Sequence, residues 1–137
     1  MDIPTITRSI STLLVGMVRT PDLIVSTEVT SISMDSRGVN KGALFIATAN
    51  DAKHRTLHFT EAIEKGAKVV LFDQLLPLSE KEIDCMALAK VQAIQVIDLS
   101  EKVSEIAARF FGHPSLALTI IAVTGTNGKT SVSHFIA

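Results

Sequence analysis

The sequence LTIIAVTGTNGKTS, residues 118–131, indicates the fold class of this chain. Its first half is a short apolar run rich in β-branched residues, which ends at Gly125 in a turn of glycines and hydroxyl residues. The segment that follows, Val132–Ala137, is compatible with a helix. Glycines allow successive backbone N–H groups to converge on a phosphate, and a helix N-terminus favours an anion there. The stretch therefore has the layout of a phosphate-binding loop.

The side chains of this loop predict a nucleotide site. Lys129 would contact the β- and γ-phosphates, and the Thr130 hydroxyl would hold Mg²⁺. The strict Walker pattern also needs a glycine five residues before Gly128, where this chain has Val123. The pattern alone thus leaves open an ordinary strand–turn–helix with incidental glycines.

The composition limits the classes of protein to which this chain can belong. A chain of 137 residues with 47% hydrophobic residues is about one domain with an ample core. The 13 Lys and Arg nearly balance the 14 Asp and Glu, and Trp and Tyr are absent, so we expect no nucleic-acid partner. The single cysteine, Cys85, fits a reducing compartment. Leu13–Val18 is too short for a signal or membrane segment, so we expect a cytoplasmic protein without a membrane partner.

Upstream of the loop, the hydrophobic pattern alternates between strands and helices. The pattern predicts strands at 23–25, 30–35, 43–47, 68–72 and 93–97. It predicts a helix over 6–17, a helix through Phe59 that Gly66 ends, a short helix within 77–90, and a helix that Ser100 caps. The buried side of that last helix is expected to carry Val103, Ile106, Ala107, Phe110 and Phe111. This alternation favours an α/β sheet.

The break Gly112-His113-Pro114 marks the predicted domain boundary. Residues 1–113 would form one domain, and residues 114–137 would be only the opening of a second.

The chain resembles the amino-terminal part of the Mur ligases, of the MurE type that adds the third amino acid to the peptidoglycan stem peptide. The residues that carry this resemblance are DSR through GALFIA (35–47), AIEKGAKVV (62–70), AARFFGHPS (107–115) and TGTNGKTS (124–131). The resemblance implies an α/β fold that begins with a UDP-binding domain, built as a mixed sheet with flanking helices. The first strand and P-loop of a truncated ATPase domain would follow it. The MurF type, which adds D-Ala-D-Ala, is more weakly similar and usually has Ser in place of Thr126.

The resemblance also implies a substrate site in the first domain. That domain of the family binds a UDP-N-acetylmuramoyl peptide, and Met34 and Ser36 match the positions at the uracil end, with Arg37 beside them. A hydroxyl at a strand end can bond a uracil edge, and a methionine can pack on the ring. Without the family, Ser36 would be a turn or capping hydroxyl and Arg37 part of a surface ion pair.

The family's ATP site would consist of the loop residues, with Lys129 catalytic and Thr130 on Mg²⁺. The implied reaction is ATP-dependent amide formation through an acyl phosphate, which joins diaminopimelate or lysine to the UDP-linked dipeptide. The loop residues are Gly125, Thr126, Asn127, Gly128, Lys129, Thr130 and Ser131.

We expect the full-length enzyme to be a monomer and this piece to be inactive by itself, binding only the UDP moiety. An unpaired strand at Leu118–Thr124 would also favour self-association. Two alternatives remain: a non-catalytic UDP-substrate-binding module and an unrelated P-loop ATPase.

Residues 50–58 depart from the family pattern. The family commonly has Gly, three variable residues and then Asp-Gly-His, whereas this chain reads NDAKHRTLH. Either Lys53, His54 or Arg55 faces the diphosphate, or the segment is a solvated basic loop.

Overall fold

The computed structural model describes residues 4–18, 26–48 and 51–119. Four parallel strands form the main sheet in the order β3 (Ser31–Ser33), β4 (Ala43–Ala47), β5 (Val69–Asp73) and β6 (Gln92–Val96). A separate antiparallel pair joins β1 (Arg8–Ser9) to β2 (Glu28–Val29). The helices are α1 (Ile10–Leu13), α3 (Ala52–Glu64), α4 (Glu80–Ala89) and α5 (Leu99–Phe110), with 3₁₀ turns η1 (Ser36–Gly38) and η2 (Pro114–Ala117).

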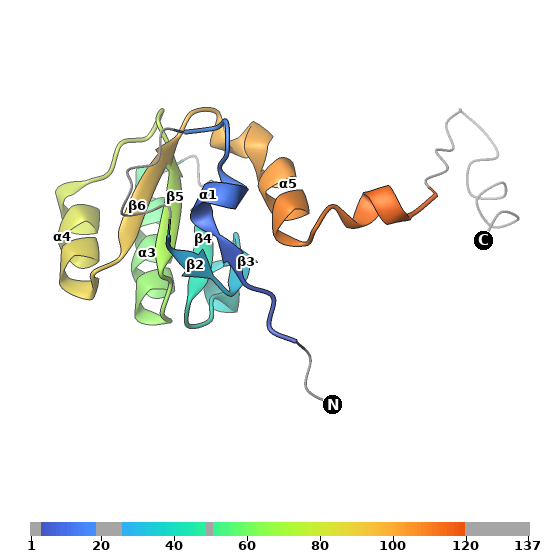
Figure 1. Ribbon diagram of the computed structural model, residues 1–137. Helices are drawn as coiled ribbons and strands as arrows, with labels where there is room; N and C mark the ends of the chain where they lie inside the picture. The colour runs from blue at the N-terminus through green and yellow to red at the C-terminus, as the bar shows by residue number, and fades with distance from the viewer. Residues whose placement is uncertain (1–3, 19–25, 49–50, 120–137) are drawn as a thin grey trace, which may run out of the picture.

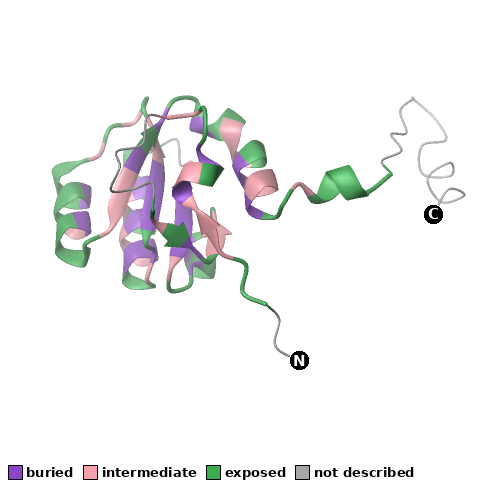
Figure 2. Cartoon of the chain, in the orientation of Figure 1, coloured by how far each residue is buried: buried purple, intermediate pink, exposed green. Residues whose placement is uncertain are grey.

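Helices cover both faces of the main sheet, α3 and α4 on one side and α1 and α5 on the other (Figure 1). Successive residues of β4 therefore enter two different cores: Leu44 packs in one cluster with Ile106 of α5, whereas Phe45 packs in the other with Phe59 of α3. All five residues of β4 are buried, and Figure 2 shows buried residues along the strands and on the helices that cover them. A sheet buried on both faces explains why β4 reads as a continuous apolar run.

The end of α3 follows from Gly66. The N–H of Ala67 donates to the Ala62 carbonyl at 3.0 Å and that of Gly66 donates to the Ile63 carbonyl at 3.0 Å, which is the Schellman arrangement. Gly66 has φ +100°, and a Cβ there would lie 2.9 Å from the Lys41 Cα. Only glycine fits this turn, so the prediction that Gly66 ends the helix is confirmed.

Four predicted strands correspond to β3–β6, and the helix predicted within 77–90 is α4. The strand predicted at 23–25 lies outside the described residues. We expected a mixed sheet, but the main sheet is parallel in all its described pairings, and the antiparallel pairing belongs to β1 and β2.

Two helix starts differ from the predictions. The helix predicted over 6–17 is reduced to α1, because Arg8 and Ser9 pair with β2 and the Ser9 side chain then caps the Thr12 N–H. The helix predicted to be capped by Ser100 begins at Leu99, two residues before the start that a Ser100 cap would give. Asp73 at the end of β5 accepts the Leu99 N–H at 2.8 Å and so replaces a local cap.

The buried side of α5 is confirmed for Ile106 and Phe110 and wrong for Phe111. Phe111 lies beyond the last helical residue, is 55% exposed, and meets the Phe110 ring edge-to-face with centroids 5.1 Å apart.

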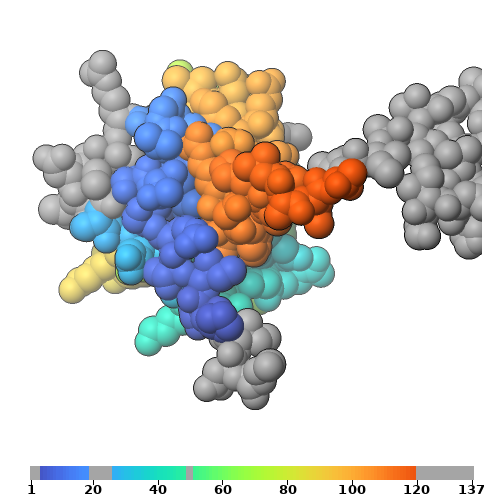
Figure 3. Space-filling view, turned by 45° about the vertical axis from the view of Figure 1, so that its right-hand side comes forward, coloured from blue at the N-terminus to red at the C-terminus, as the bar shows by residue number. Residues whose placement is uncertain are grey.

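The amino-terminal segment is fastened to α5, and Figure 3 shows the two lying side by side. Arg8 Nε donates to the Phe110 carbonyl at 3.0 Å, and Arg109 Nη1 donates to the carbonyls of Leu13 and Val15 at 3.0 and 2.9 Å. Among the helices described, none has the length and apolar character needed to cross a membrane.

Candidate functional site at the carboxyl ends of the strands

The candidate site lies at the carboxyl end of β4, where two cavities adjoin. The Met34 cavity has a volume of about 220 Å³, and its walls are Met34, Phe45, Ile46, Ala47, Thr48, Arg55 and His58. The Asp73 cavity has a volume of about 240 Å³, and its walls are Ala47, Thr48, Arg55, Asp73, Leu75, Leu76 and Ser100. The carboxyl edge of an open parallel sheet is where such folds bind their ligands.

The segment after β3 supplies one wall of the Met34 cavity. β3 ends at Ser33, and Asp35 then caps η1 by accepting the Arg37 N–H at 2.9 Å. Met34 between them is 52% exposed and lines the cavity. The local turn thus puts an apolar, flexible side chain at the mouth of a strand-end hollow, which is where the sequence had suggested a ligand-packing residue.

Ser36 lies beneath this wall and does not line the cavity. It is 1% exposed, its Oγ is 3.1 Å from His58 Nδ1, and it donates a hydrogen bond to Glu61 Oε2. The pKa of Glu61 is lowered, first by the Ser36 hydrogen bond and then by Lys65, whose Nζ is 3.1 Å from Oε1. The hydroxyl therefore links η1 to α3.

Arg37 is at the surface. Its side chain is 81% exposed, and its Nη2 forms an ion pair with Asp35 Oδ2 at 2.7 Å. Hydrogen bonds from the Arg37 side chain and backbone lower the pKa of Asp35 to about 2. The surface ion pair considered for Arg37 from the sequence is therefore present.

The divergent segment 50–58 is helical from Ala52 onward, so the interpretation of these residues as a loop is wrong. Asp51 caps the helix by accepting the Lys53 N–H at 3.0 Å. Lys53 and His54 are exposed on α3, whereas Arg55 is buried and lines both cavities.

The charge of Arg55 is matched inside the protein. Its Nη2 is 2.7 Å and its Nε 3.0 Å from the two carboxylate oxygens of Glu82 on α4, and it also donates to the carbonyls of Leu76 and Pro77. The Ser-x-x-Glu spacing of Ser79 and Glu82 is a capping-box signal in the sequence. The sequence contains no signal that Glu82 pairs with Arg55, because the two residues are 27 positions apart.

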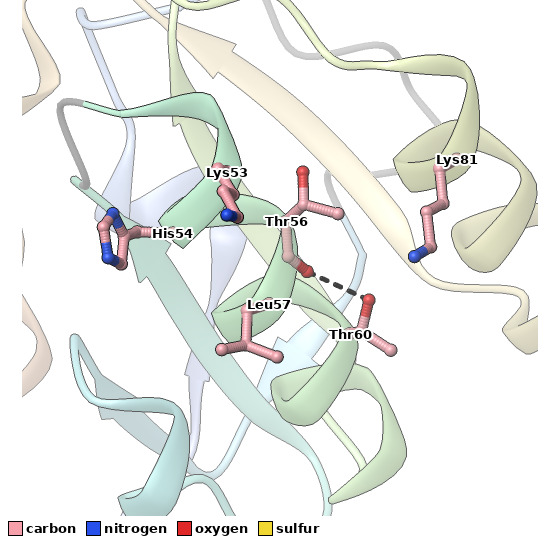
Figure 4. Close-up of a pocket in the computed structure, with 6 residues that line it drawn as sticks. All are labelled: Lys53, His54, Thr56, Leu57, Thr60 and Lys81. Atoms are coloured by element: carbon pink, nitrogen blue, oxygen red, sulfur yellow. Dashed lines mark hydrogen bonds between the residues drawn. The ribbon is translucent and has the colours of Figure 1, made fainter.

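A third hollow, of about 560 Å³, lies on the outer side of α3 toward α4 (Figure 4). Its walls are Lys53, His54, Thr56, Leu57, Thr60 and Lys81. His54 contacts Asp51 at 2.5 Å, and the Thr60 hydroxyl donates to the Thr56 carbonyl at 3.0 Å. The Thr56 hydroxyl lies 2.9 Å from the Ala52 carbonyl and 3.1 Å from Glu82 Oε1, so Thr56 adds a contact between α3 and α4. This third hollow shares no wall residue with the strand-end cavities: of the α3 residues, Arg55 lines both of those cavities and His58 lines the Met34 cavity.

The phosphate-binding loop lies outside the described residues, and with it Gly125, Thr126, Asn127, Gly128, Lys129, Thr130 and Ser131. In the described part of the chain, no three His, Cys, Asp or Glu side chains gather in a group that could hold a metal ion.

A parallel sheet covered on both faces, with hollows at its carboxyl edge, defines an α/β ligand-binding domain. The model of the Mur ligase family, catalytic domain, matches residues 28–111. This chain belongs to the Mur ligase family.

Similar curated proteins carry the name UDP-N-acetylmuramoyl-L-alanyl-D-glutamate–2,6-diaminopimelate ligase. The protein from Pseudomonas aeruginosa is 38% identical over 110 residues, which covers 77% of this chain and 20% of the relative. The protein from Ectopseudomonas mendocina is 40% identical over 106 residues, which again covers 77% of this chain and 20% of the relative. The protein from Xylella fastidiosa is 36% identical over 116 residues, which covers 85% of this chain and 21% of the relative. The chain thus spans about a fifth of the length of these relatives.

Proposed function

We propose that this chain is the substrate-binding part of an ATP-dependent ligase of peptidoglycan synthesis. The ligase would add the third stem-peptide residue to UDP-N-acetylmuramoyl-L-alanyl-D-glutamate through an acyl phosphate, in the cytoplasm. The observation that carries the proposal is the similarity to three ligases of that name over most of this chain. Their name favours diaminopimelate over lysine as the added residue and the third-residue ligase over the D-Ala-D-Ala ligase.

The uridine end of the substrate would occupy the Met34 cavity. Met34 is exposed at its wall and can pack on a pyrimidine ring, and Phe45 and Ile46 make the remainder of the lining largely apolar. Each strand-end cavity is smaller than the ~300–1,000 Å³ usual for a ligand site. A nucleotide would therefore span both cavities across the end of β4, with Ser36 below the base and Arg37 at the rim.

The phosphate-binding loop would supply the ATP site of the whole enzyme. Its donor set fits: Gly125 and Gly128 leave backbone N–H groups accessible, Lys129 offers a cation, and Thr130 offers a hard oxygen to Mg²⁺. ATP would supply the phosphoryl group that converts the substrate carboxylate to an acyl phosphate, with ADP as the leaving group, and Lys129 would offset the charge of the transferring group.

The proposed domain division, 1–113 and 114–137, is supported by the path of the chain. After Gly112 the residues of η2 are all exposed, and Figure 1 shows η2 pointing away from the sheet.

Titration of the 137-residue chain with UDP, followed by backbone amide chemical shifts, tests the substrate site. We expect shifts at residues 34–37 and 44–55. Met34→Ala should weaken binding, while Leu88→Ala, at an exposed leucine of α4, should not change it. Shifts confined to α4 and α5 would reject the site.

A further inference from the structure

The hydroxyl of Ser36 has a fixed hydrogen-bond direction. A serine hydroxyl carries one proton, and an ionised carboxylate can only accept. Glu61 is held ionised by its bonds to Ser36 and Lys65, so the Ser36 proton points to Glu61 Oε2. The Ser36 oxygen must then accept its other bond, which joins it to His58 Nδ1 at 3.1 Å.

This direction sets the tautomer of His58. Because the Ser36 oxygen accepts, Nδ1 of His58 carries the proton, and in the neutral ring Nε2 is then a bare acceptor. His58 lines the Met34 cavity, and its Nδ1 is already used by Ser36. The polar atom that His58 can offer a ligand in this cavity is therefore Nε2, as an acceptor.

The other walls of the Met34 cavity make this acceptor selective. Met34, Phe45, Ile46 and Ala47 are apolar, Thr48 carries a hydroxyl, and the guanidinium of Arg55 bonds Glu82 and two backbone carbonyls. A largely apolar cavity with an oriented acceptor on one wall favours a flat ring that presents an N–H at its edge. A site built to hydrogen-bond an N–H discriminates against the analogue that lacks it.

We propose that His58 determines base specificity in this cavity, its Nε2 accepting a hydrogen bond from an imide N–H such as N3–H of uracil, with Ser36 and Glu61 as positioning residues. The proposal rests on the proposed function, which places a uridine nucleotide at this site. It moves the polar contact with the base from Ser36, which is buried and does not line the cavity, to His58, which does.

The tautomer can be measured without a ligand. Ring ¹⁵N chemical shifts and long-range ¹H–¹⁵N couplings, recorded at pH 8, distinguish a protonated from a bare nitrogen. We expect a protonated Nδ1 and a bare Nε2 for His58 in the wild-type chain. Ser36→Ala should release the preference and give a mixture of tautomers. A protonated Nε2 in the wild-type chain would overturn the proposal.

Binding of UDP is then compared with that of 3-methyluridine diphosphate, which has no N3–H. For wild type we expect the methylated probe to bind about tenfold more weakly, the effect of one lost hydrogen bond. His58→Phe keeps the ring but removes the acceptor, so it should weaken UDP binding about tenfold and abolish the difference between the probes. His58→Gln retains an acceptor oxygen and should recover part of the affinity. The control is Leu57→Ala, at the neighbouring exposed residue of α3, which does not line the cavity.

The outcomes separate the two proposals. If UDP binds wild type but His58→Phe binds both probes as wild type does, the role of His58 is wrong while the substrate site stands. If wild type does not bind UDP, the proposed function fails and the specificity role fails with it.

Discussion

Arg55 on α3 and Glu82 on α4 form a buried ion pair, with side chains 2% and 0% exposed and Nη2 2.7 Å from Oε2. Arg55 also holds the carbonyls of Leu76 and Pro77, and Glu82 also accepts the Ser79 N–H at 2.8 Å. One pair of side chains therefore ties α3, the segment after β5 and the start of α4 together. Arg55 also lines both strand-end cavities.

We predict that Arg55→Met lowers the free energy of unfolding by about 3–5 kcal/mol, because it leaves the Glu82 carboxylate buried without its partner. Urea unfolding at neutral pH measures the change, which should appear as a lower midpoint at an unchanged slope.

The double variant Arg55→Met/Glu82→Gln should recover much of this loss, because glutamine is neutral and can still close the capping box. The surface comparison is Arg37→Met, which breaks an exposed, solvent-screened pair and should therefore be far less destabilising than Arg55→Met. If Arg55→Met is no more destabilising than Arg37→Met, the buried ion pair contributes no more to the stability of the fold than the exposed one.

We predict a second effect on acidification. Burial opposes ionisation of Glu82, yet the hydrogen bonds from Arg55 and Ser79 outweigh it, and the pKa of Glu82 is lowered. The pKa values of Glu61 and Asp35 are lowered too, by Ser36 and Arg37 respectively. A lowered folded pKa gives stability that is complete above the unfolded pKa of about 4 and is lost as pH falls through the folded values.

Urea unfolding between pH 7 and pH 3 should therefore show little change in stability above about pH 5 and a steady fall below about pH 4. In Arg55→Met, the pH dependence of stability that comes from Glu82 should reverse. Without its partner, the buried Glu82 carboxyl has a raised pKa, so its protonation at low pH stabilises the folded state. A wild-type stability that is flat down to pH 3 would contradict this assignment.

The sequence predicted those parts of the fold that rest on local signals. The apolar run Ala43–Ala47 reads as a buried strand because both its faces are covered, and Gly66 ends α3 because only glycine fits there. Met34 was predicted at a strand end and lies there, in a cavity wall.

Contacts between distant residues were not predictable in the same way. Arg55 reads as a basic residue of a polar segment, and only the packing of α4 on α3 shows that Glu82 neutralises it. Ser36 was expected to face a ligand, but η1 turns its hydroxyl toward His58 and Glu61, which follow 22 and 25 residues later. Periodicity records which face of a helix is apolar and carries no information about which polar partners meet across elements.

Asp73 and Ser100 provide a third prediction, about the start of α5. Ser100 is the cap expected from the sequence, but Asp73 is the residue that accepts the Leu99 N–H, and it also accepts the Leu75 N–H at 2.9 Å. Asp73→Ala should therefore lower the free energy of unfolding by about 1 kcal/mol, as loss of a helix cap does. Ser100→Ala should be neutral or slightly stabilising, because alanine is the better helix former inside α5. Thermal and urea unfolding of both variants would show the reverse order if Ser100 were the true cap.

The fourth prediction concerns Lys129 in the full-length ligase that we propose. Lys129→Ala should lower turnover by at least about 10²-fold, since one lost contact to a developing charge typically costs that much. Affinity for the UDP-linked dipeptide should stay within twofold of wild type, because Lys129 belongs to residues 114–137 and the substrate cavity to residues 1–113.

Steady-state rates and a substrate-binding isotherm measure the two quantities separately. The control is Lys81→Ala, which removes an exposed lysine of α4 outside both strand-end cavities and should leave rate and affinity near wild type. Thr130→Ala extends the test: if its hydroxyl holds Mg²⁺, the variant should require a higher Mg²⁺ concentration for half-maximal rate while binding the dipeptide normally. Near-normal turnover of Lys129→Ala would remove this lysine from the mechanism. A parallel loss of dipeptide affinity would instead show that the loop and the strand-end cavities are parts of one site, and the division of labour between residues 1–113 and 114–137 would have to be abandoned.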